Sequence, residues 1–203
     1  EDYLRMLRAI RFSVQKDFNI ELNTFFNIYE HAHHIESISI ERINAELSKI
    51  LLSDSPDKGI KQLKILRLLE FILPEVNRLD EVDQNPEYHP EGDVFKHTLN
   101  ALKKSPKNLL VRMALLLHDI GKYYCTVVED GKIKSPYHEE KSYKMAIDIL
   151  KRLRIDNETT ENVLWLIRHH GIFMHWDQFN QCKKYTFMVH LLFDNLVAHY
   201  KAD

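Results

Sequence analysis

The chain has 203 residues, a formal net charge of −2 and 44% hydrophobic residues, so it can bury a sizeable core in one or two domains. The small net charge excludes a protein whose whole surface attracts polyanions, although local basic faces can still exist. The sequence shows neither a signal peptide nor a membrane-spanning stretch, which favours a cytoplasmic protein without a membrane partner. Cys125 and Cys182 fit no metal or redox spacing and are expected to be reduced thiols.

Leucine and isoleucine recur with a period of about 3.6 residues along most of the chain, while glycine and proline are few. This pattern predicts an all-α protein. The β structure that we expect is at most one short hairpin at Val127–Ile133, where Asp130-Gly131 is a turn signal.

At the start of the chain, Asp2 and Arg5 lie three positions apart and share a helix face. A carboxylate beside a guanidinium can read the Watson–Crick edge of cytosine or adenine, because both bases present an exocyclic amine and ring acceptors. An ordinary surface salt bridge is the commoner explanation of an isolated pair. Further basic residues recur at helical spacing and form either an RNA-binding or a solvated face. They are Arg8 and Arg11, then Lys58, Lys61, Lys64 and Arg67.

The dipeptide His118-Asp119 ends an apolar helical run, and Gly121 and Lys122 follow it. A nitrogen ligand beside an oxygen ligand suits a divalent metal. Gly121 is typical of the residue that closes a helix. Lys122 is suited to an anionic substrate. Because His-Asp is a common dipeptide, the assignment of a metal site depends on further ligands.

A first further ligand is His97, which lies one turn inside a helix for which Asp93 is a good N-cap. If this helix packs antiparallel to the one that ends at His118, His97 faces the pair His118-Asp119. Taken alone, His97 is better explained as a core histidine that is hydrogen-bonded to a carbonyl.

Other histidines mark two more helix ends. His138 opens an amphipathic helix, whose N-terminus attracts anions, and this suits a phosphate or a second metal. His169 and His170 end a third apolar helix, where one imidazolium can complement the helix dipole while the other is a ligand. The remaining histidines are predicted to be surface residues: His31, His33, His34, His175, His190 and His199.

Several of these motifs together resemble one family. Residues 1–20 carry Glu-Asp-x-x-Arg and Arg-Ala-x-Arg-Phe, which are similar to the nucleotide-selecting segment of the bacterial tRNA nucleotidyltransferase (CCA-adding)/poly(A) polymerase family. Residues 40–75 resemble the neck of that family, and the His-Pro-Glu-Gly-Asp-Val block at 89–94 resembles the opening of its HD domain. The resemblance covers the whole chain in order. It implies a nucleotide-selecting and tRNA-binding neck region at 1–76, a linker at 77–92 and an HD metal-dependent phosphohydrolase domain, a helical bundle, at 93–203.

The resemblance also implies roles for individual residues. A late aspartate should complete the metal site, and Ala202-Asp203 fits the family pattern better than Asp194. The metal ligands would be His97, His118, Asp119 and Asp203. A second metal or a phosphate would be held by His138, His169, His170 and Lys122. Asp119 and Lys122 would be catalytic, and the base would be selected by Asp2, Arg5 and Arg8.

The implied activity is hydrolysis of 2′,3′-cyclic phosphates, 2′-nucleotides or phosphates at RNA 3′ ends, with Mn, Ni, Co, Fe or Mg as the divalent cofactor. The implied partners are tRNA, nucleotide phosphoesters, and CTP and ATP in a full-length parent, with a homodimer as a further assembly. Nucleotidyl transfer is not expected of these residues, because they lack the Gly-Gly or Gly-Ser loop and the Asp-x-Asp pair of the catalytic head. The alternative is a non-catalytic scaffold for tRNA binding and dimerisation with a vestigial metal site.

Overall fold

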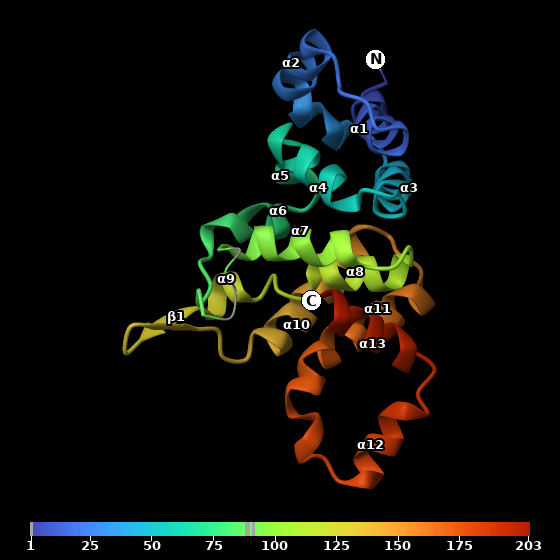
Figure 1. Ribbon diagram of the computed structural model, residues 1–203. Helices are drawn as coiled ribbons and strands as arrows, with labels where there is room; N and C mark the ends of the chain where they lie inside the picture. The colour runs from blue at the N-terminus through green and yellow to red at the C-terminus, as the bar shows by residue number, and fades with distance from the viewer. Residues whose placement is uncertain (1, 88–89, 91) are drawn as a thin grey trace.

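The computed structural model describes residues 2–87, 90 and 92–203. Glu1, Tyr88, His89 and Glu91, which belong to the sequence blocks that resemble the family, lie outside the described residues. Helices form nearly all of the regular structure, so the predicted all-α fold is confirmed (Figure 1). None of the described helices has both the length and the apolar character that a membrane span needs.

The first part of the chain folds into short helices that are stacked at one end of the molecule (Figure 1, blue to green). Helix α1 is amphipathic and buries its apolar face against α3 and α4. The elements are α1 (Leu4–Lys16), α2 (Leu22–His31), the 3₁₀ helix η1 (Ala32–Ser37), α3 (Ile40–Leu51), α4 (Pro56–Ile65), α5 (Leu68–Ile72), α6 (Pro74–Asn77) and the 3₁₀ helix η2 (Arg78–Glu81).

The second part is a helical bundle around α8 (Leu109–Leu117). This helix is apolar on nearly every side, and it therefore occupies the centre of the bundle, where α7, α11 and α13 pack against it. The other elements are α7 (Val94–Lys104), α9 (Lys122–Cys125), α10 (His138–Arg152), α11 (Asn157–His169), the 3₁₀ helix η3 (His170–Gln178), α12 (Gln181–Met188) and α13 (Phe193–Ala202).

The predicted hairpin is also confirmed. Strands β1 (Val127–Glu129) and β2 (Lys132–Lys134) pair antiparallel, and Asp130 and Gly131 join them. Both turn residues have positive φ angles, 50° and 71°, as a two-residue type I′ turn requires.

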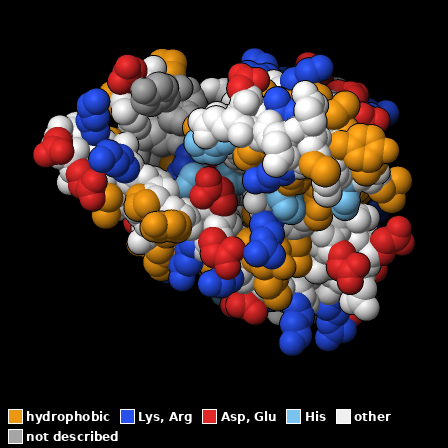
Figure 2. All heavy atoms as spheres, turned by 90° about the horizontal axis from the view of Figure 1, so that it is seen from below, with side chains coloured by type: hydrophobic (Ala, Val, Ile, Leu, Met, Phe, Trp, Pro, Cys, Tyr) orange, Lys and Arg blue, Asp and Glu red, His pale blue; other side chains and the backbone are white. Residues whose placement is uncertain are grey.

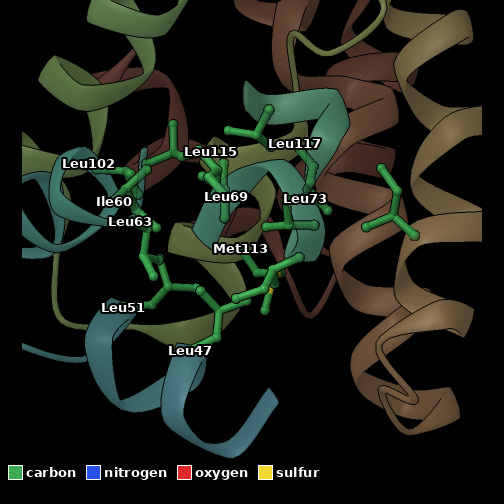
Figure 3. Packing of buried hydrophobic residues seen from close by; sticks show 14 of the residues in the cluster. Leu47, Leu51, Ile60, Leu63, Leu69, Leu73, Leu102, Met113, Leu115 and Leu117 are labelled. Carbon is green, nitrogen blue, oxygen red and sulfur yellow. The ribbon is translucent and has the colours of Figure 1, made fainter. Parts of the chain in front are cut away.

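One hydrophobic core runs through both parts of the molecule, because α4 packs against α7 and α3 packs against α8. The guanidinium of Arg112 on α8 strengthens this junction. It is buried and donates hydrogen bonds to the carbonyls of Leu51, at the end of α3, and Ser53, and to the hydroxyl of Ser105. Figure 3 shows the leucines that interlock here, among them Leu47, Leu51, Leu63, Leu102 and Leu115.

The polar segment 77–92, expected to be a linker, is partly packed where it is described. Leu79 and Val82 are buried in the common core. The backbone N–H of Val94 donates to the carbonyl of Val82, and Asp83 forms an isolated β-bridge with Asp93. These contacts close the segment into a loop, which brings Gln84 to the bundle.

Candidate metal centre

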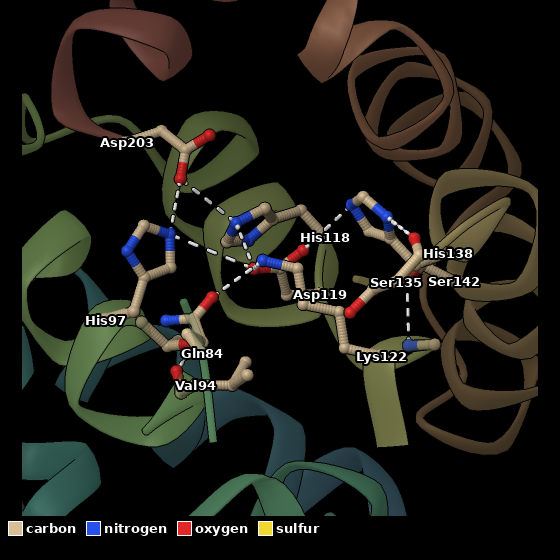
Figure 4. Close-up of polar contacts among 12 residues, drawn as sticks. Gln84, Val94, His97, His118, Asp119, Lys122, Ser135, His138, Ser142 and Asp203 are labelled. Atoms are coloured by element: carbon tan, nitrogen blue, oxygen red, sulfur yellow. Dashed lines mark hydrogen bonds and ion pairs between the residues drawn. The ribbon is translucent and has the colours of Figure 1, made fainter. Parts of the chain in front are cut away.

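Three side chains from three separate helix ends meet beside α8. His97 extends from α7, whose predicted N-cap Asp93 accepts a hydrogen bond from the N–H of Lys96. His118 follows α8, and Asp203 follows α13 (Figure 4). The Nε2 atoms of His97 and His118 lie 2.7 Å and 3.1 Å from Oδ1 of Asp203. Ligand atoms of all three residues lie within 4.8 Å of one another, which is close enough for one cation to hold them.

A second group of three adjoins the first. It consists of Asp119, His138 at the start of α10, and His170 at the start of η3, and their ligand atoms also lie within 4.8 Å of one another. Oδ1 of Asp119 lies 3.3 Å from Nε2 of His138, while Oδ2 lies 3.3 Å from Nε2 of His118. Asp119 therefore directs one oxygen toward each group and joins the two.

The backbone fixes the tautomers of three of these histidines. The Nδ1 atoms of His118, His138 and His170 lie 2.8, 2.7 and 2.7 Å from backbone carbonyl oxygens. A carbonyl can only accept, so each Nδ1 carries the proton and donates it. When the imidazole is neutral, Nε2 then keeps its lone pair, which is the arrangement typical of metal-binding histidines. The accepting carbonyls belong to Leu115, Ser135 and Ile167.

The buried atoms of the site are suited to a cation. Nε2 of His118 and both carboxylate oxygens of Asp119 are enclosed, yet none has an aligned hydrogen-bond partner within the described part of the chain. Buried polar atoms without an aligned hydrogen bond are rare in folded proteins and are typical of sites that bind an ion or water. Because one of the three atoms here is an imidazole nitrogen, which offers a lone pair when the ring is neutral, and two are carboxylate oxygens, the donor set fits a divalent transition metal.

The charges of the site reinforce one another. Burial lowers the pKa of His118, but the carboxylates of Asp119 and Asp203 outweigh it and raise this pKa to about 10. Burial likewise raises the pKa of both carboxyl groups, and the charge of His118 instead holds each pKa well below its usual value. The proton on His118 thus occupies the place between two carboxylates that a cation would take.

His170 and His199 are also buried, and both are neutral. Burial, together with the charge of His118, lowers the pKa of His170 to about 4. His199 was expected at the surface, and this prediction was wrong: its side chain is fully buried on α13, and its ring contacts that of His118 at a centroid distance of 5.3 Å. Burial holds the pKa of His199 well below its usual value. His190 was also expected at the surface, yet it is half-buried and stacks on Trp165.

Lys122 lies beside the two groups. Its Nζ is 2.7 Å from Oδ2 of Asp119 and donates a hydrogen bond of 2.8 Å to Oε1 of Gln84. Gln84 belongs to the segment between the neck and the bundle, and no sequence motif marks it as a site residue. Irregular segments have no periodicity from which the direction of one side chain can be read.

The ligand groups lie at the bottom of a cleft of about 600 Å³ (Figure 2). This volume is in the range of small-molecule binding sites. The walls come from distant parts of the chain, and they include Gln84 and Asn85, Lys132 and Ser135 near the hairpin, and Met174 and Tyr200.

Gly121 has a different role from the one predicted. It does not close α8 in a left-handed conformation, because its φ and ψ angles, −70° and −23°, are those of a right-handed helix. A Cβ atom here would lie 2.5 Å from the carbonyl oxygen of His138 and 2.7 Å from the amide nitrogen of Ser142. The N–H of Gly121 also donates to Oγ of Ser142. Glycine therefore allows α10 to approach the His118-Asp119 turn.

Two predicted candidates are not brought into the site. Nδ1 of His169 donates to the carbonyl of Trp165, and its ring packs against Trp165 and Phe187 rather than lining the cleft. Of the two neighbouring histidines, only His170 thus joins the ligand groups. Asp194, the alternative late aspartate, is exposed on α13.

The proposed base-selecting residues lie at the other end of the molecule. The carboxylate of Asp2 pairs with the guanidinium of Arg42 at 2.9 Å, and it does so just before α1 begins. Arg5 is exposed on α1. Arg8 approaches the buried carboxylate of Glu46 at 3.9 Å. The pair that the structure forms is therefore Asp2–Arg42 rather than Asp2–Arg5.

Most of the basic residues of the neck also pair with carboxylates of the chain rather than forming a free basic face. Three of them pair within the chain: Lys58 with Asp17, Lys64 with Asp80, and Arg67 with Glu70, while Lys61 is exposed.

Comparisons with known proteins agree with both parts of the fold. Residues 17–79 match the model of the probable RNA- and SrmB-binding site of polymerase A, and residues 94–190 match the HD domain. The multifunctional CCA protein of Polaromonas naphthalenivorans is 34% identical over 177 residues, which are 84% of this chain and 41% of that protein. The proteins of the same name from Cupriavidus metallidurans and Acinetobacter baumannii are 33% and 32% identical, each over 84% of this chain and 42% and 43% of their own lengths.

The chain is similar to these CCA proteins, and it contains the RNA-binding match and the HD match one after the other. It spans about two fifths of the length of the CCA proteins that it matches. The HD match includes five of the six residues in the two ligand groups and ends before Asp203.

Proposed function

We propose that residues 93–203 form a metal-dependent phosphohydrolase that acts on 2′,3′-cyclic phosphates, nucleotides or phosphates at RNA 3′ ends. The observation that carries the proposal is the position of Asp119, whose two oxygens face two adjoining groups of histidine and carboxylate ligands. The HD match and the cleft above these groups support it.

In this proposal His97, His118, Asp119 and Asp203 hold one divalent cation, drawn from Mn, Ni, Co, Fe and Mg. Asp119, His138 and His170 hold a second cation or contact a phosphate. Bound cations would polarise the phosphoryl oxygens and lower the pKa of water.

Other groups of the chain position the ligands and neutralise charge on the substrate. Carbonyl hydrogen bonds hold the imidazoles of His118, His138 and His170 in place. The ammonium of Lys122, fixed between Asp119 and Gln84, neutralises charge that develops on the phosphoryl group.

The test is hydrolysis by the whole chain, purified without chelator and assayed with 2′,3′-cyclic AMP and with a 3′-phosphorylated oligonucleotide. Asp119→Ala should abolish turnover while the far-ultraviolet circular dichroism stays unchanged, because the residue supplies charge rather than core volume. Asp148→Ala, at an exposed carboxylate of α10, is the control and should keep full activity. Undiminished turnover in Asp119→Ala would show that hydrolysis takes place at another site. RNA binding by a chain that neither takes up metal nor hydrolyses phosphoesters would favour the scaffold.

For the neck we propose contact with tRNA, which the RNA-binding match at residues 17–79 supports, and hence a cytoplasmic place of action. In a full-length parent with nucleotidyl transfer, Asp2, Arg5 and Arg8 would select CTP and ATP. There, Asp2→Ala should relax discrimination against UTP and GTP, and misincorporation assays with all four nucleotides would measure it. An unchanged preference would remove Asp2 from this role. Light scattering with and without tRNA tests the expected homodimer.

A further inference from the structure

Gln84 is a buried amide on the wall of the cleft. Only 7% of Gln84 is exposed to solvent. The residue lies in the loop that the β-bridge between Asp83 and Asp93 closes, and not in the helical bundle. Figure 4 shows its side chain next to Lys122 and His97. The amide therefore reaches the site from a part of the chain that supplies none of the six ligands.

The orientation of this amide follows from its neighbour. Nζ of Lys122 lies 2.8 Å from the Gln84 side chain. A lysine ammonium has only donors, so the atom that faces it must be the acceptor Oε1. Nε2, with its two N–H groups, consequently lies on the other side of the amide. The neighbouring lysine thus settles the usual ambiguity between the two ends of a glutamine.

The donor on Nε2 has no partner in the described part of the chain, although it is enclosed. Nε2 of His118 and the oxygens of Asp119, the atoms that we assign to a cation, also lack an aligned hydrogen bond, but they lie in ion pairs with one another and with neighbouring cations. A buried N–H without an acceptor is unfavourable, and folded proteins keep few of them. Unlike those three atoms, however, an amide N–H cannot bind a cation. It requires an oxygen acceptor, and Gln84 lines the cleft in which we expect a phosphoester.

We propose that Gln84 binds the phosphoester substrate directly: Nε2 donates a hydrogen bond to an oxygen of the phosphoryl group, while Oε1 holds Lys122 in position. The inference rests on the proposed function, because it needs a phosphoester in the cleft. It assigns two tasks to one amide, and these tasks can be separated. Glutamate keeps an acceptor for Lys122 but loses the donor, whereas methionine, of similar length, loses both.

The experiment measures binding of inorganic phosphate to the manganese-loaded chain by isothermal titration calorimetry, and KM and kcat for 2′,3′-cyclic AMP. Gln84→Glu and Gln84→Met should both weaken phosphate binding about tenfold or more, since a hydrogen bond to a charged group is lost. Asn85→Asp is the matched control. It makes the same change from amide to carboxylate one position away on the cleft wall, and its Oδ1 can still accept from the N–H of Glu87. This control should weaken phosphate binding less than Gln84→Glu does, because it adds the same charge but removes no proposed donor to the phosphoryl group.

Three results would overturn the inference. Parent-like phosphate binding by Gln84→Glu, with weak binding by Gln84→Met, would mean that the residue acts only through Lys122. Equal weakening by Gln84→Glu and Asn85→Asp would mean that added charge alone is responsible. Parent-like binding by both Gln84 variants would mean that Nε2 contacts no phosphoryl oxygen. Failure of the parent itself to bind phosphate or hydrolyse the ester is a different result and would refute the proposed function as well.

Discussion

Oδ1 of Asp203 lies 2.7 Å from Nε2 of His97, although 106 positions separate the two residues. The contact joins the end of α13 to α7 and completes the first ligand group. A second aspartate, Asp194, is exposed near the start of α13, so the two ends of this helix offer a candidate ligand and a comparable residue outside the site.

We expect Asp203→Asn to lose metal. An amide is a poorer ligand than a carboxylate, and removal even of the outer partners of metal ligands weakens affinity by about 10–100-fold. Asp194→Asn should bind metal as the parent does. Metal content after dialysis, measured by mass spectrometry of the ions, compares the two. Equal metal in both variants would remove Asp203 from the ligand set.

Metal should stabilise the chain more at high pH. The pKa of His118 is raised to about 10 in the folded chain, above its unfolded value of about 6.5. The stability that its proton provides is therefore present below pH 6.5 and is lost as the pH rises toward 10. A divalent cation replaces that proton. Melting temperatures with EDTA should fall from pH 6.5 to 8.5, and the increase caused by Mn²⁺ should be larger at pH 8.5. A metal effect that does not depend on pH would contradict this linkage.

Gly121→Ala should damage both the fold and the site. The added Cβ would meet backbone atoms of His138 and Ser142 on α10, which cannot move independently. We expect a loss of about 1–3 kcal/mol, typical of overpacking, together with weaker metal binding as His138 shifts. Gly171→Ala is the control, since among the described residues its Cβ would approach only Oε1 of Glu139, at 3.2 Å, on a side chain that can rotate away. Denaturant titrations would show a smaller change for the control. An equal free energy of unfolding in the two variants would mean that α10 accommodates the added Cβ of Gly121→Ala without loss of stability.

Arg112→Met should destabilise the junction between the neck and the bundle. The substitution leaves the buried carbonyls of Leu51 and Ser53 without their donor, which costs about 1–3 kcal/mol. Lys107→Met removes the exposed ion pair with Asp54 near the same junction and should cost less than about 1 kcal/mol. Urea titrations measure both. A larger loss in Lys107→Met would show that the surface pair holds the junction instead.

The sequence predicted the helical class, the hairpin and most of the residues that meet in the site. His97 and His118 could be predicted because each lies near a helix end, where N-caps, glycines and apolar periodicity are informative, whereas Asp203 was expected only from the resemblance to the family. His199 was misread although it precedes Asp203 by one helical turn, and the spacing i, i+4 places both on one face. That signal was present in the sequence.

Other features depend on tertiary contacts that a single sequence does not encode locally. Only the continuation of α11 into η3 determines which of His169 and His170 turns inward. Gly121 resembles a helix terminator by position, but the close approach of α10 explains it. Gln84 lies in a segment without periodicity, and its direction depends on Lys122, 38 positions away.

The carbonyl hydrogen bonds of His118, His138 and His170 have a consequence for the dynamics of the site. Each accepting carbonyl lies only three positions before its histidine, so each of these three rings is hydrogen-bonded to its own stretch of backbone rather than to a neighbouring side chain. The rotational entropy of these rings is lost when the chain folds, not when an ion arrives. The ion should therefore bind to a preorganised site. We expect fast uptake and little change in the amide NMR spectrum beyond the site.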